Sequence, residues 1–208
     1  MPQRAERIAA TPVHQHRDSP QTQSRRDAIT QLRRQGILAA ARKLLTAQDQ
    51  AAGQPSLRAI AAAAGYSAPA LYAYFHGREA IFGALFSEEL IPLGRAVKAA
   101  LAEASPGMAP IESARIEGGA VAIYRYALEH WGIVRLGLAF ETADTDQNPT
   151  MRATTGRLIG ALAPLANALQ ATAGIEAEEA NRRTLALFAA ALGAAGLDAA
   201  GRLKALGL

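Results

Sequence analysis

From Arg25 onward, apolar residues recur every three or four positions, which is the spacing of one face of an α-helix, and no segment alternates as a half-buried strand would. The first stripe consists of Ile37, Ala41, Leu44 and Leu45. Further helical segments are predicted near residues 78–90, 94–104, 111–129, 131–142, 150–173 and 176–195. Pro92 is expected to end the helix 78–90 because proline lacks the N–H that continues a helix. The pattern predicts an all-α chain.

The stretch SLRAIAAAAGYSAPALYAYF, residues 56–75, has the spacing of a helix-turn-helix. Ser56 and Ser67 are good N-caps for its two helices. Ala61 is small enough for a close helix crossing, Gly65 suits a turn that needs positive φ, and Leu71 faces back as an apolar anchor. The small core between the helices is completed by Ile60, Ala64 and Phe75.

The second helix of this unit carries side chains suited to DNA. Its N-terminal end, which normally meets base edges in the major groove, consists of Tyr66, Ser67, Ala68, Pro69 and Ala70. Tyr72 and Tyr74 have hydroxyls able to reach phosphates, and Arg78 stands at the next helix start. An alanine-rich helix pair joined by glycine also occurs in ordinary α-bundles, and the tyrosines could be core residues.

The segments ILAAARKLL, SLRAIAAAAGYSAPALYAYF and GREAIFGAL, between Ile37 and Leu85, resemble the tetracycline-repressor (TetR) family of bacterial transcription regulators. The resemblance implies a three-helix DNA-binding head, a connecting helix, and a C-terminal domain that binds a small molecule and dimerises. Carried over by position, it implies phosphate contacts from the start of the first helix of the unit, base contacts from residues 67–70, and backbone contacts beyond them. The residues in question are Ser56 and Arg58, then Ser67, Ala68, Pro69 and Ala70, then Tyr72, Tyr74, His76 and Arg78.

Two departures from the family pattern affect the expected readout. Gly77-Arg78 stands where the family more often has Ser-Lys, so the charge is kept and a hydroxyl is lost. Ala68-Pro69-Ala70 has no hydrogen-bonding side chain, so direct readout would depend on thymine methyl contacts, on Tyr66 and Ser67, and on DNA shape. We expect modest discrimination per base pair.

Charge and composition suggest three regions. Residues 1–24, rich in Pro, Gln, Thr, Ser and Arg, are expected to form a flexible basic arm. Residues 25–90 would be the DNA-binding domain with its connecting helix, and 91–208 a helical effector-binding and dimerisation domain. The net charge of +4 lies in the first part, since residues 1–90 carry 11 Lys and Arg against 7 Asp and Glu, and the rest carry 11 against 11. There are two interpretations of Arg17, Arg25 and Arg26: they contact the minor groove from the arm, or they belong to a solvated tail.

The segment AIYRYALEHWGIVRLGLAFE, residues 122–141, resembles a stretch in one subgroup of these regulators, with Trp131 where proline is common. Its aromatic residues suggest a mostly apolar effector pocket, although ordinary core packing explains them as well. The apolar candidates are Phe86, Tyr124, Trp131 and Phe140, and the polar candidates are Glu117, Arg135 and Glu141.

The last two long segments are apolar nearly all round, which favours a two-fold dimer of paired antiparallel helices. Pro164 is expected to kink the first of them. The predicted interface consists of Leu158, Leu162, Leu165, Leu169, Leu185, Phe188 and Leu192.

We therefore expect a ligand-released repressor that acts as a dimer on a palindromic double-stranded DNA operator. The alternatives are a helical protein-binding adaptor and a ligand-independent DNA-binding regulator. No serine elbow, phosphate loop, paired acids or histidine cluster is present, so we expect neither an enzyme nor a metal or cofactor site. The absence of cysteine and of a signal-peptide core, with a longest apolar run at 185–197, favours a soluble cytoplasmic protein without a membrane span.

Overall fold

The computed structural model describes residues 20–47, 54–103, 111–138, 149–205 and 207. Every regular element in these ranges is a helix. They are α1 (Pro20–Ala47), α2 (Leu57–Ala63), α3 (Ala68–Leu71), α4 (Arg78–Glu103), α5 (Ile111–Glu129), α6 (Trp131–Leu138), α7 (Pro149–Ala173), α8 (Ala177–Ala199) and α9 (Arg202–Ala205). The prediction of an all-α fold is confirmed.

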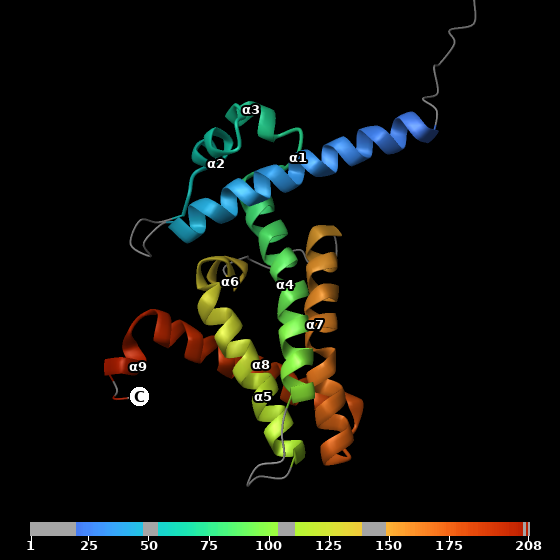
Figure 1. Cartoon of the computed structure of the whole chain (residues 1–208), viewed down its shortest axis with the longest axis vertical. Helices are drawn as coiled ribbons and strands as arrows, with labels where there is room; N and C mark the ends of the chain where they lie inside the picture. Colours follow the sequence, from blue (N-terminus) through green and yellow to red (C-terminus); the bar gives the residue numbers. More distant parts are fainter. Residues whose placement is uncertain (1–19, 48–53, 104–110, 139–148, 206, 208) are drawn as a thin grey trace, which may run out of the picture.

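The helices form two layers joined by α4 (Figure 1). Helices α1, α2 and α3 form a head above the upper end of α4, and α1 crosses that end. Below it, α4 packs along α7 on one side and α5 on the other, while α8 crosses behind α5 and packs against both α5 and α7. One apolar core runs through both layers, from Ile37 in α1 to Ala195 in α8.

Pro92 does not end a helix, contrary to the sequence-based prediction. Helix α4 continues through it to Glu103, and the expected segments 78–90 and 94–104 are one element. The reason is packing, because the apolar stripe runs on without a break on both sides of Pro92, and burying it outweighs the cost of about 3 kcal/mol for an internal proline. The buried stripe includes Leu90, Leu93, Val97 and Leu101.

Helix α1 begins earlier than the sequence pattern indicated. Pro20 is its first residue, which suits proline because the first helical N–H has no intrahelical partner. The expected flexible arm 1–24 therefore ends in helix at residues 20–24, and residues 1–19 lie outside the described residues. Arg25 and Arg26 lie on α1, while Arg17 lies outside the described part of the chain.

Candidate nucleic-acid interface

Helices α2 and α3 are set by two serine caps and a glycine turn. The Ser56 hydroxyl accepts a hydrogen bond from the amide of Ala59 at 3.1 Å, and the Ser67 hydroxyl accepts one from the amide of Ala70 at 3.4 Å. Gly65 between them has φ 77°, in the left-handed region that glycine adopts without strain. Both caps and the positive-φ turn were predicted from the sequence.

The same unit is anchored by a small buried core. Ala61 is 1% exposed at the crossing of the two helices, and the anchor Leu71 is completely buried. Ile60 and Phe75 are also buried, and Ala64 packs against them in part, as predicted. This core fixes the orientation of α3 relative to α1 and α4.

The N-terminal end of α3 faces outward. Exposed residues at and after this end include Ser67, Pro69, Tyr72 and His76. Arg58 on the preceding helix, α2, is also exposed. Tyr66, Ala68 and Ala70 are half-buried. The helix itself is one turn long, and the chain continues as turns through Tyr74. Such an end on a packed scaffold can enter a major groove.

Tyr74 differs from the other predicted backbone contacts. Its hydroxyl accepts a hydrogen bond from the guanidinium of Arg33 at 3.0 Å, and this bond raises the pKa of Arg33 above its ordinary value. The centre of the Tyr74 ring lies 5.9 Å from the centre of the Tyr66 ring. Arg34 donates to the Tyr74 carbonyl and lies 4.1 Å from the centre of the Phe75 ring. Helix α1 thus presents Arg33 beside the predicted backbone-contacting tyrosine. The sequence analysis missed this pair because the two residues are 41 positions apart.

Arg78 is held at the start of α4. Its guanidinium forms an ion pair with Glu79 at 3.1 Å and lies 5.8 Å from the centre of the Phe82 ring. The side chain is 37% exposed, so it remains accessible at the end of the head. A phosphate at this position would compete with the neighbouring carboxylate.

The described members of the predicted effector pocket have different surroundings. Glu117 is exposed on α5, and the Tyr124 hydroxyl donates to Asp198 at 2.5 Å, which raises the pKa of Tyr124. Trp131 packs closely against Gly196 of α8, and Arg135 is half-buried on α6 with no hydrogen-bond partner at its buried Nε. Phe140 and Glu141 lie outside the described residues. Helical spacing does not show which face each residue presents, so the exposure of Glu117 could not be foreseen, and its place in an effector pocket stays a prediction.

Of the described members of that set, Phe86 lines an interior void, which has a volume of about 10 Å³. The void is nearly filled, and the Phe86 ring lies so close to Gly137 that a Cβ there would collide with it. Its two polar wall residues, Glu89 and Tyr126, were not recognised in the sequence analysis. The complete lining is Phe86, Glu89, Leu90, Leu93, Ile123, Tyr126, Ala127, Val134, Phe188 and Leu192.

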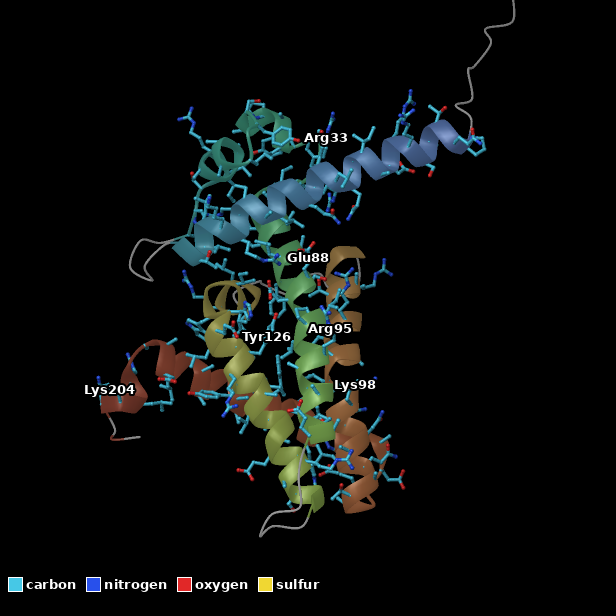
Figure 2. The ribbon with its side chains drawn as sticks, in the orientation of Figure 1. Arg33, Glu88, Arg95, Lys98, Tyr126 and Lys204 are labelled. Atoms are coloured by element: carbon cyan, nitrogen blue, oxygen red, sulfur yellow. The ribbon has the colours of Figure 1, made fainter. Side chains whose placement is uncertain are left out.

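Glu89 joins the head to the core. Its carboxylate lies 2.8 Å from the guanidinium of Arg42 on α1, and the Tyr126 hydroxyl of α5 donates to it at 2.5 Å. Burial and this hydrogen bond raise the pKa of Tyr126 above its ordinary value. The Nδ1 atom of His130 lies 3.7 Å from Oε2 of Glu89, and the centres of the His130 and Tyr126 rings are 4.3 Å apart. We call Arg42, Glu89, Tyr126 and His130 the joint. Figure 2 shows Glu88, the neighbour of Glu89, on the upper part of α4 below α1, and Tyr126 between α5 and α4.

Most of the predicted dimer interface is buried in the chain's own core. Leu162, Leu165, Leu169, Phe188 and Leu192 are all less than a tenth exposed, and Leu158 is half-buried. The buried members pack inward because α7 and α8 lie against α4 and α5, and Leu185, at 54% exposure, is the member of the set most open to a partner. The strongly exposed apolar residue of α7 is Ile159, at 66%, which the sequence analysis did not select. Pro164 lies within α7, which continues through it.

Two further features concern the described residues. No helix among them is long and apolar enough to cross a bilayer. They hold no group of three or more His, Cys, Asp or Glu side chains placed to bind a metal ion.

Residues 37–85 match the family model for bacterial regulatory proteins of the tetR family. No match to a curated protein was found. Among solved structures, a protein of unknown function from Rhodococcus sp. RHA1 is similar, with a TM-score of 0.60 and 26% identity over 83% of this chain and 85% of that one. A TetR family transcription regulator from Marinobacter aquaeolei VT8 shares the fold, with a TM-score of 0.52 and 19% identity over 86% of this chain and 88% of that one. The matched segment contains the capped α2–α3 unit with its outward-facing helix end, and this part of the chain is therefore similar to the DNA-binding segment of the tetR family of bacterial regulatory proteins.

Proposed function

We propose that the protein is a ligand-released repressor that binds a palindromic operator as a homodimer. The observation that carries the proposal is the exposed N-terminal end of α3, with Ser67 and Pro69, followed by the exposed C-cap residue Tyr72, all on a buried scaffold. In a two-fold dimer, two such ends would enter successive major grooves, about 34–36 Å apart. Ser67 to Ala70 would face bases, and Ser56, Arg58, Tyr72, His76 and Arg78 would contact the sugar-phosphate backbone.

The two layers of the fold would have different functions. The head, α1 to α3 with the first turns of α4, would bind DNA, and the rest would bind effector and dimerise. The boundary expected near residue 90 lies inside α4, so both parts share one continuous helix. A shift of α4 in the core would therefore move the head.

The joint supports ligand release. An effector entering between α4, α5 and α8 would have to displace Phe86 or Tyr126, because these side chains close the void. Moving Tyr126 breaks its hydrogen bond to Glu89, and Glu89 holds Arg42 of the head. Ligand would then weaken DNA binding, and DNA would weaken ligand binding by the same factor.

The size of the void favours the alternative of a ligand-independent regulator. A volume of about 10 Å³ is at the lower limit for a single water molecule. If the core stays closed, the protein would bind DNA without an effector. The two mechanisms differ in one measurable result, since only the first predicts a compound that releases the DNA and raises the unfolding temperature of the free protein.

The first experiment is binding of the purified protein to labelled DNA from just upstream of its own gene, compared with scrambled DNA across a salt series. Tight binding that prefers the upstream DNA and weakens with salt supports the proposal. Arg58→Gln is expected to weaken binding, and the matched control Arg125→Gln, an exposed arginine on α5, is not. Equal weak binding of both DNAs by the wild type, unchanged in Arg58→Gln, would contradict DNA reading by this surface and favour a protein-binding adaptor.

A further inference from the structure

The first part of α1 extends beyond the body of the head (Figure 1). Residues 20–33, which we call the overhang, are all exposed, whereas Ile37 and Leu38 just after them are buried. The overhang also exposes two large apolar side chains, Ile29 at 43% and Leu32 at 66%. An isolated helix of this length is marginal in water, and because residues 20–33 are all exposed, no buried side chain of the segment adds to its stability.

The overhang is basic. Arg25, Arg26 and Arg33 lie on it, and Asp27 is its acidic residue. Arg26 and Arg33 are seven positions apart, which places them on the same face two turns from each other. A helix with this charge fits a polyanion and disfavours a cationic surface.

The basic face continues into the helix-turn-helix unit. Arg33, at the inner end of the overhang, donates to the hydroxyl of Tyr74, and the Tyr74 ring packs near Tyr66, next to the cap of α3. Arg34 bonds the Tyr74 carbonyl and covers the Phe75 ring. Figure 2 shows Arg33 on α1 on the side where α3 lies. The orientation of α1 is thus fixed to the surface that would face DNA.

We propose that the overhang of α1 is a second DNA-binding surface, which contacts the sugar-phosphate backbone outside the groove entered by α3. The proposal rests on the proposed function, because it needs α3 to hold the DNA first. The contact is electrostatic and independent of sequence, so it raises affinity for all DNA and leaves the preference for the operator unchanged.

The test compares Arg25→Gln/Arg26→Gln with the wild type on operator and scrambled DNA at several salt concentrations. Both residues lie away from the Tyr74 contact, so the variant keeps the helix-turn-helix unit intact. Each lost phosphate contact reduces the slope of log affinity against log salt by about 0.9, so we expect a reduction of about 1 to 2 and weaker binding of both DNAs by a similar factor. The matched control Arg202→Gln/Lys204→Gln removes two charges from α9, which lies at the left of the lower layer in Figure 2, away from the overhang, and keeps the wild-type slope.

The outcomes separate this inference from the proposed function. If the wild type prefers its operator but the overhang variant has the same slope and affinity, the overhang does not touch DNA and the inference fails alone. If no DNA is preferred by any variant, the proposed function fails. If Ile29→Ser/Leu32→Ser lowers the oligomeric mass while the salt slope of Arg25→Gln/Arg26→Gln is unchanged, a second copy of the chain covers the overhang, which also overturns the inference.

Discussion

Glu89 of α4 and Arg42 of α1 form an ion pair across the boundary between core and head, with 2.8 Å between Oε1 and the guanidinium. Glu89 is 7% exposed and Arg42 is 40% exposed, so the carboxylate is buried while its partner reaches solvent. The Tyr126 hydroxyl satisfies the other carboxylate oxygen. A buried carboxylate that depends on partners from two other helices is sensitive to any movement of either.

Glu89→Gln is expected to destabilise the chain by about 1–3 kcal/mol, below the range for a fully buried pair because Arg42 is partly exposed. It should also weaken operator binding several-fold, because the head loses a fixed orientation on the core. Urea unfolding and DNA titration measure the two effects.

Glu88→Gln is the matched control, since Glu88 meets the same guanidinium at 3.3 Å but is 37% exposed. We expect less than about 0.5 kcal/mol from it. Equal effects from both variants would show that burial of Glu89 does not matter to the head.

The raised pKa of Tyr126 predicts that the folded chain loses stability at alkaline pH. Burial, and then the hydrogen bond to Glu89, raise the pKa of Tyr126 in the folded chain, whereas in the unfolded chain it loses its proton near the ordinary pKa of about 10. The resulting stability is complete below pH about 10 and is lost as the pH rises toward the folded pKa. The free energy of unfolding of the wild type should therefore fall more steeply above that pH than that of Tyr126→Phe.

The control for this pH dependence is Tyr72→Phe, which removes an exposed hydroxyl in the head and should follow the wild type. Parallel curves for the wild type and Tyr126→Phe would contradict a buried, hydrogen-bonded Tyr126.

Two glycines predict opposite responses to alanine. Gly65→Ala forces a Cβ into the left-handed region at φ 77° and should cost about 1–2 kcal/mol, although the space around it is open. Gly36→Ala lies in α1 with no neighbour within 4 Å and ordinary helical backbone, so it should stabilise by about 0.5–1 kcal/mol. Denaturation midpoints test the pair. A neutral Gly65→Ala would mean that the turn of the helix-turn-helix can relax.

The sequence predicted the α2–α3 unit well because each requirement there is local. A cap needs a serine three residues before an amide, and a turn needs a glycine, so Ser56, Gly65 and Ser67 could be placed by counting. The outer face of α3 followed from the same spacing. Pro92 was misread because its local cost is outweighed by a stripe that extends on both sides.

The core site could not be predicted in this way. Glu89 and Tyr126 meet from different helices, and nothing in their spacing of 37 residues indicates it. The leucines of α7 and α8 show the same limit, because periodicity identifies an apolar face but not whether the chain itself or a partner covers it. Leu165 is covered by the chain's own helices.

Ile159 and Leu185 predict where a second subunit binds. They remain exposed on α7 and α8 at 66% and 54%, whereas Leu162, Leu165, Leu169 and Leu192 of these helices are buried. In a two-fold dimer each substitution acts twice, so Ile159→Glu should raise the dimer dissociation constant at least about 100-fold by burying an unpaired charge. Val121→Glu, on α5 at 37% exposure, is the matched control and should leave the mass unchanged. Sedimentation at micromolar concentration should find a dimer for the wild type and Val121→Glu, and a monomer for Ile159→Glu. The monomer should also lose most operator affinity, because one head then binds without the second held at the adjacent half-site. A dimeric Ile159→Glu with full operator affinity would place the interface on another face.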